Sequence, residues 1–348
     1  MAYTNIDDPS AHFQTALYTG NATDNRAITY DGNSDMQPDF LWFKTRSTTE
    51  NHALIDSTRG ITKHLRANTT SDEKTKTTLL KSFDSNGFTL GIDSLTNSNG
   101  NTLVSWGWKA NGGTTSTDTT SSITSTVQVN SDAGFSVVTY TGDGTTTGGF
   151  GHGLGVAPKV VFVKRRNAAA NWCVYHESIG AGFYLQLDTT AAQQSGPWQN
   201  LAPSSTTFVV YGGGLVNGNG DTYVAYCFAE KQGYSKFGKY VGNGSQDGTM
   251  VYTGFKPAFV IMKRTDNAGA WHVFDNKRSG YNYANDVLQA DATAAELSGQ
   301  TYQFVDLLSN GFKVRRATYG PNVSGGTYIY IAFAENPFVA GGIPTTAR

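Results

Sequence analysis

The sequence predicts an all-β protein built from three tandem β-sandwich modules of the jelly-roll or concanavalin-like kind. Three observations support this fold class: a composition typical of short strands and tight turns, a scarcity of helical patterns, and a set of motifs that recurs three times. The 348 residues include 40 glycines, only 15% of them are charged, and 12% are aromatic. Aromatic and β-branched residues favour strands, whereas Gly, Asn and Ser favour turns.

The first recurring motif is a proline followed by an apolar run that ends in lysine. It occupies residues 38–44, 158–164 and 257–263. Each run is short and rich in β-branched or aromatic residues, which predicts a buried strand. The lysines that end these runs are Lys44, Lys164 and Lys263.

The other motifs keep the same order and nearly the same spacing in each copy. A second strand places Asp56, His176 and Asp275 each 18 positions after the proline of its copy. A closing strand, which begins with threonine, and an opening strand upstream of the proline complete each copy. The closing strands are 102–108, 222–228 and 327–333, and the opening strands are 13–20, 135–142 and 237–242.

A period near 100 residues is long for a solenoid repeat and suits one complete sandwich per copy. We expect module 1 at residues 1–113, a linker at 114–121, module 2 at 122–231, module 3 at 232–338 and a C-terminal tail at 339–348. Residues 110–131 are rich in Gly, Thr and Ser, whereas the junction at 230–234 is short. Modules 2 and 3 are therefore expected to lie closer together than modules 1 and 2.

Alternation along the closing strands predicts which side chains are buried. One face carries large residues such as Trp106, Tyr226 and Ile331, and we expect it to fill the sandwich interior. The opposite face carries small residues, which suggests a central strand with close packing on both sides. Short helices are expected at 71–81 and 292–297, and Asn-Gly pairs at 86–87 and 310–311 predict type I′ hairpins.

Charge and hydropathy exclude several classes of protein. A net charge of −1 argues against a nucleic-acid-binding protein, which would need a basic face. Apolar runs fall short of the roughly 18 residues that a membrane helix needs. The first residues lack the pattern of a signal peptide, so synthesis in a cytoplasm is expected. Cys173 and Cys227 lie in strand-like runs and are interpreted as buried apolar residues.

Candidate contact residues come from a predicted pairing of lysine with tryptophan. If the two strands after each proline form a hairpin, Lys164 lies near Trp172 and Lys263 near Trp271. Such a pair is either a ligand-facing cation–π platform or, the favoured interpretation, a structural contact in which the lysine stem covers apolar surface. The first copy has His52 at the tryptophan position. Loop aromatics that could reach a ligand are Tyr281, Tyr283 and Tyr319.

No catalytic, cofactor-binding or metal-binding residue is predicted. A glycosidase needs two carboxylates in one cleft, but Asp56 and Asp275 belong to different copies and His176 replaces the acid in the middle one. The six histidines lack metal-ligand spacing. The glycine-rich stretch 148–155 does not open a helix, so it is interpreted as a loop rather than a phosphate cradle.

Residues 1–112 resemble a family of virion proteins of unassigned role from marine tailed phages. The resemblance rests on 2–21, 40–46, 56–65, 82–91 and 104–112, which read AYTNIDDPSAHFQTALYTGN, FLWFKTR, DSTRGITKHL, SFDSNGFTLG and VSWGWKANG. It implies concanavalin-like or jelly-roll sandwiches in a tail or capsid-surface component, with no catalytic residues to carry over. The later copies match only through the recurring motifs.

We therefore expect a non-enzymatic bacteriophage virion protein, most simply a tail fibre, appendage or adaptor that can contact host-surface glycans. The alternatives are a capsid decoration protein and, less favoured, a carbohydrate-active enzyme. The expected partners are other virion proteins, further copies of the chain in a homo-oligomer, and a host cell-surface glycan, without nucleic acid, cofactor or membrane insertion. The expected location is the virion, after synthesis in the cytoplasm of the bacterial host.

Overall fold

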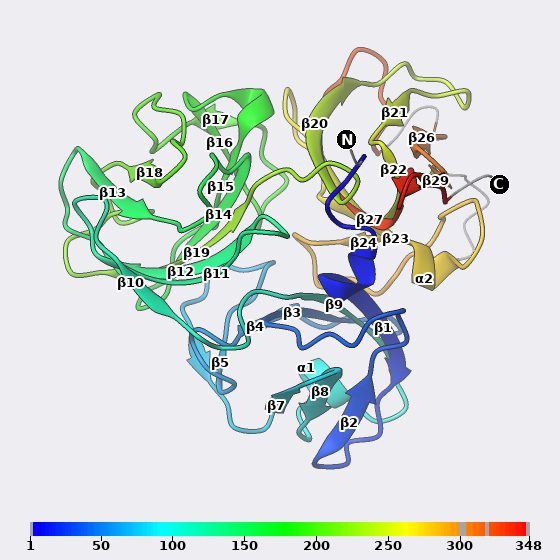
Figure 1. The fold of residues 1–348 in the computed structure, drawn as a ribbon, viewed down its shortest axis with the longest axis horizontal. Helices are drawn as coiled ribbons and strands as arrows, with labels where there is room; N and C mark the ends of the chain where they lie inside the picture. Colours follow the sequence, from blue (N-terminus) through cyan, green and yellow to red (C-terminus); the bar gives the residue numbers. More distant parts are fainter. Residues whose placement is uncertain (1–2, 299–303, 317–319, 346–348) are drawn as a thin grey trace.

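The computed structural model describes residues 3–298, 304–316 and 320–345. It is nearly all β, with 43% strand and 4% helix, which confirms the predicted all-β class. The strands form three lobes around a common centre (Figure 1). The lobes are numbered in chain order, and each contains one larger and one smaller antiparallel sheet. No described helix is long and apolar enough to cross a membrane.

Lobe 1 is built around a four-stranded sheet. Its order is β1 (Phe13–Thr19), β9 (Thr102–Trp108), β3 (Phe40–Thr45) and β4 (Ala53–Asp56). The smaller sheet is β2 (Arg26–Thr29), β8 (Gly87–Leu90) and β7 (Leu80–Asp84). The remaining elements are η1 (Pro9–Ala11), α1 (Ser94–Asn97) and the pair β5 (Lys63–His64) and β6 (Lys74–Thr75).

Lobe 2 has the longest sheet. Its order is β10 (Ser116–Asp118), β11 (Ser125–Asn130), β12 (Phe135–Thr141), β19 (Thr222–Phe228), β14 (Val160–Arg165), β15 (Cys173–His176), β16 (Phe183–Gln186) and β17 (Gln194–Ser195). The smaller sheet pairs β13 (Gly148–Gly151) with β18 (Thr207–Val210), and η2 spans Glu177–Ile179. β10 lies within residues 114–121, which were expected to form a linker. This segment forms a strand there because it pairs with β11.

Lobe 3 has a five-stranded sheet. Its order is β20 (Ser235–Val241), β27 (Thr327–Pro337), β22 (Phe255–Arg264), β23 (His272–Asp275) and β24 (Leu288–Gln289). The smaller sheet is β21 (Met250–Tyr252), β26 (Gly311–Val314) and β25 (Val305–Leu308). The lobe also contains α2 (Asn276–Ser279) and the pair β28 (Val339–Ala340) and β29 (Ile343–Pro344).

The three larger sheets share one order of four strands and one register. In each, the closing strand lies between the opening strand and the proline-led strand, so it is central, as predicted. The recurring lysines occupy matching positions in this register: they pair as Lys44↔Val104, Lys164↔Val224 and Lys263↔Ile329.

The largest apolar core lies between the lobes rather than inside one of them. It contains the large-residue face of the closing strands, including Trp106, Tyr226 and Ile331, which are buried as predicted. The expectation that this face fills each sandwich is wrong, because the sandwich interiors hold the small-residue face, such as Ala225 and Ala332. Both faces of each closing strand are therefore buried. All three lobes meet at this core. The short junction at 230–234 therefore does not bring lobes 2 and 3 closer together than lobes 1 and 2.

Both predicted helices are absent. Residues 71–81 contain β6 and the start of β7, because their threonines favour extended backbone. Residues 292–297 are extended, and the Thr293 carbonyl accepts hydrogen bonds from lobe 1. These tertiary contacts outweigh a weak helical preference.

The Asn-Gly hairpins form at the predicted places with a different geometry. Register places Ser85 and Asn86 in the first loop, so Gly87 is the first residue of β8. Neither Asn86 nor Asn310 has a positive φ, which type I′ requires. A Cβ on Gly87 would lie 2.0 Å from the Ile28 carbonyl oxygen, and glycine is needed there for that close approach.

Candidate functional site

The recurring lysines connect each lobe to the one before it. Lys164 Nζ of lobe 2 donates to the carbonyl oxygen of Thr70 in lobe 1 at 2.9 Å. Lys263 of lobe 3 donates to Thr190 in lobe 2 at 2.8 Å, and Lys44 of lobe 1 donates to Thr293 in lobe 3 at 3.2 Å. One contact thus recurs at all three seams, the interfaces between neighbouring lobes, and closes the lobes into a ring. Burial penalises the charged form and lowers the pKa of each lysine to about 8.

A ring nitrogen next to each lysine makes a second contact across the same seam. Trp172 Nε1 donates to the Arg66 carbonyl at 2.9 Å, and Trp271 Nε1 donates to the Gln186 carbonyl at 2.8 Å. In lobe 1 His52 Nε2 lies 3.0 Å from the Gln289 carbonyl oxygen.

His52 is held in its neutral form by both of its ring nitrogens. Nδ1 accepts a hydrogen bond from Trp42 Nε1 at 2.8 Å, so the proton sits on Nε2. Burial and the nearby Lys44 lower the pKa of His52 to about 3.

These contacts decide between the two interpretations of the lysine–tryptophan pairs. Lys164 and Lys263 lie 6.0 and 5.9 Å from the ring centroids of Trp172 and Trp271, so the predicted proximity is present. All four residues are 0% exposed. They do not lie on the surface, and the interpretation as a ligand-facing platform is corrected to that of a buried contact between lobes.

A buried ion network joins lobes 1 and 2. Arg59 Nε lies 2.5 Å from Asp56 Oδ2, and Nη1 lies 2.8 Å from Glu73 Oε2, with the arginine side chain 0% exposed. Tyr226 of lobe 2 donates its hydroxyl to Asp56 at 2.7 Å. Burial alone would lower the pKa of Arg59, but Asp56, Tyr226 and Glu73 outweigh it and hold that pKa above its ordinary value. The network therefore carries a buried cation across the seam.

The seam between lobes 3 and 1 repeats this network. Arg278 Nε lies 2.5 Å from Asp275, and Nη1 lies 2.8 Å from Glu296. Asp275 accepts from Trp106 Nε1 of lobe 1 at 2.9 Å, and Glu296 accepts from Arg46.

The seam between lobes 2 and 3 has no such ions at the matching positions. Here His176 faces the Tyr330 carbonyl at 3.2 Å, and Ile179 and Gln193 stand in place of arginine and glutamate. Sequence reasoning noted the positions of Asp56, His176 and Asp275 but missed Arg59 and Arg278. The available signal was an arginine three residues after each aspartate, absent where the aspartate is histidine.

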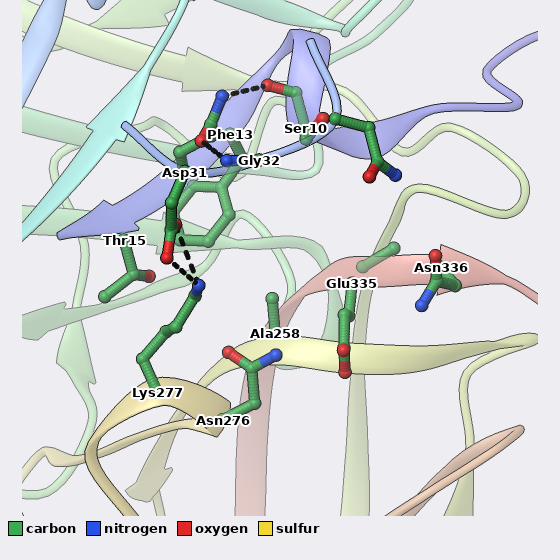
Figure 2. A pocket seen from close by; sticks show the side chains of 13 residues that line it. Ser10, Phe13, Thr15, Asp31, Gly32, Ala258, Asn276, Lys277, Glu335 and Asn336 are labelled. Atoms are coloured by element: carbon green, nitrogen blue, oxygen red, sulfur yellow. Dashed lines mark hydrogen bonds and ion pairs between the residues drawn. The ribbon is translucent and has the colours of Figure 1, made fainter. Parts of the chain in front are cut away.

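A polar groove opens on the seam between lobes 1 and 3, with a volume of about 260 Å³ (Figure 2). Lobe 1 contributes residues from 10–15 and 31–33, and lobe 3 contributes Ala258, α2 and the end of β27. Lys277 bridges the two lobes through an ion pair with Asp31 at 2.8 Å. A second cavity of about 260 Å³ adjoins it and shares Asn276 and Glu335.

The structure describes two of the three loop tyrosines predicted to reach a ligand. Tyr281 lines the second cavity and is 90% exposed, and Tyr283 nearby in sequence is 42% exposed. Tyr319 lies outside the described residues. The groove itself was not predicted, because segments far apart in the chain form its walls.

The described residues contain no cluster of three His, Cys, Asp or Glu side chains that could hold a metal ion. Cys173 and Cys227 are buried and free, and burial raises the pKa of both thiols, to about 12 for Cys227. The two carboxylates of the groove are paired with cations: Asp31 with Lys277, and Glu335 with Lys256 at 2.8 Å.

The fold and groove define an all-β protein with three interlocked lobes and a polar groove at one seam. Residues 8–337 match the family described as a domain of unknown function (DUF7483), and the chain therefore belongs to that family. The match covers all three lobes. No curated protein and no solved structure matches the chain.

Proposed function

We propose that the chain is a non-enzymatic structural protein of a bacteriophage virion, located in the tail as a fibre, appendage or adaptor. In this proposal it consists of three copies of one β-sandwich module, at 1–113, 122–231 and 232–338. It assembles with other virion proteins and contacts glycans on the host surface. It is made in the host cytoplasm and ends in the particle.

The observation that carries the proposal is the same lysine–carbonyl contact at all three seams. It joins each lobe to the next, which suits a part that transmits force or holds position. The matching strand order and register of the three larger sheets support the three-copy interpretation. The resemblance of residues 1–112 to a phage virion family supports the location.

Quantitative mass spectrometry of purified particles tests the location. We expect the chain at a few to a few dozen copies per particle, on the scale of a tail component. Hundreds of copies would favour capsid decoration instead. Absence from particles of the phage that encodes the chain would contradict a virion role altogether.

The absence of enzymatic activity needs its own measurement. Purified protein is expected to show no turnover of polysaccharide, peptide or ester substrates. A hydrolytic rate that disappears in the Asp31→Asn or Glu335→Gln variant would place catalysis in the groove and overturn this part of the proposal.

A further inference from the structure

We propose that the groove between lobes 1 and 3 binds a short stretch of a neutral glycan. This inference deepens the proposed contact with host-surface glycans and rests on it. The first reason is an unpaired hydroxyl in the groove wall. Thr15 is 5% exposed and lines the groove, yet its buried Oγ1 has no hydrogen-bond partner among the described residues. A buried polar atom without a partner costs free energy, and a ligand hydroxyl would satisfy it.

The groove wall around Thr15 is rigid. Gln14 Oε1 accepts from the Gly32 N–H at 2.9 Å, and Gln14 Nε2 donates to the carbonyls of Ser10 and Ser34. A Cβ at position 32 would lie 2.5 Å from Gln14 Oε1, so glycine lets the loop approach this side chain. A site whose wall is already fixed loses little entropy when a ligand binds.

The charges of the groove favour a neutral ligand. Of the charged residues that line the groove, Lys277 is paired with Asp31, and Glu335 is paired with Lys256 of the adjoining cavity, both at 2.8 Å. An ionic ligand would have to break one of these pairs. A ligand with hydroxyl groups can instead bond to Thr15 and to the side-chain amides of Asn276 and Asn336, which also line the groove.

The second cavity adds the surface on which a sugar ring could stack. Tyr281 is 90% exposed beside it, and the two cavities share Asn276 and Glu335. Each measures about 260 Å³, so the two together reach the size range of ligand sites, roughly 300–1,000 Å³. The apolar face of a sugar on tyrosine, with hydroxyls directed at Thr15 and the asparagines, would use both.

The experiment is an array of neutral hexose oligosaccharides printed beside acidic ones that contain uronic or sialic acid, probed with the full chain. Calorimetry then measures the affinity for the neutral oligosaccharide that gives the strongest signal. We expect binding to neutral members. Thr15→Val and Tyr281→Ala should each weaken it at least about tenfold. Thr15→Val keeps the side-chain volume, so folding is not expected to suffer.

The chain offers a matched control for each variant. Thr45 also has a buried hydroxyl without a partner among the described residues, but it does not line the groove, so Thr45→Val should leave binding unchanged. Tyr252 is 57% exposed on β21 and controls for Tyr281. Absence of binding, a preference for acidic oligosaccharides, or wild-type affinity in both groove variants would overturn the inference. The particle copy number is measured separately. A tail protein that binds no glycan would contradict this inference and the proposed glycan contact but not the virion location, whereas a glycan binder absent from particles would contradict only the virion role.

Discussion

Replacing Arg59 by isoleucine tests whether buried ions lock lobe 1 to lobe 2. The substitution removes the guanidinium that Asp56 and Glu73 contact at 2.5 and 2.8 Å and leaves Asp56, which is 0% exposed, without that cation. Removing one partner of a buried ion pair typically costs about 3–5 kcal/mol, most of it from the unpaired charge left behind. We expect the free energy of unfolding to fall by about that amount in denaturant titrations.

The control is a partly exposed ion pair within lobe 2. Arg165 pairs with Asp221 at 2.5 Å, with side chains 23% and 14% exposed, and does not cross a seam. Arg165→Ile should cost less than about 1 kcal/mol, because solvent screens the pair and hydrates the aspartate that remains.

The seam between lobes 2 and 3 suggests a combined variant that should restore the stability lost in Arg59→Ile. It uses His176, Ile179 and Gln193 at the matching positions. The combined variant Asp56→His, Arg59→Ile, Glu73→Gln carries this pattern, and the imidazole introduced at position 56 can accept the Tyr226 hydroxyl. It should recover most of the stability that Arg59→Ile loses. A cost below 1 kcal/mol for the single variant, or a combined variant that is no more stable, would refute the reasoning.

Three further predictions concern the seams and the central core. The pKa of His52 is lowered from an ordinary 6.5 to about 3, so the contribution of its neutral form to stability is complete above pH 6.5 and should fall by about 2 kcal/mol by pH 5. The double variant Trp42→Phe, His52→Trp introduces the pair found at Phe162 and Trp172, and it should reduce this loss of stability in denaturant titrations. Lys164→Met leaves the Thr70 and Ala170 carbonyls without their charged donor and should cost about 1–3 kcal/mol, whereas Lys236→Met, at an exposed pair, should cost under about 1 by the same titration. Trp106→Ala should cost about 3–5 kcal/mol and lower the temperature of one calorimetric transition; a lobe that melts separately would contradict a shared core.

The strands were the most predictable part of the fold. Each apolar run that follows a proline forms a strand, because its short length and its β-branched and aromatic side chains favour a strand over a helix. The proximity of Lys164 to Trp172 followed from the same hairpin pairing. The burial of these two side chains could not be predicted from the local sequence, because it depends on the carbonyls of Thr70 and Arg66 in another lobe.

The direction of the sheet faces was not predictable from alternation. In a strand exposed on one face, polar residues mark the side that meets solvent. Ile331 and Ala332 lie on opposite faces of β27 and are 2% and 0% exposed, so the difference between them is one of size and not of polarity. Size does not tell which face meets its own smaller sheet and which meets the other lobes.

Ring closure connects this fold to both proposed roles. Each lysine contact joins segments at least 73 residues apart: Lys263 meets Thr190 across 73 positions, Lys164 meets Thr70 across 94, and Lys44 meets Thr293 across 249. The last contact brings the end of the chain back to its beginning, which leaves the groove between lobes 1 and 3 at the point where the ring closes. In the other two seams consecutive lobes meet, whereas here η1, the loop after β2, α2 and β27 converge from opposite ends of the sequence. Because the two lobes that form this groove are bonded to lobe 2 as well as to each other, a ligand held there would be coupled mechanically to the whole chain, as the proposed host attachment requires.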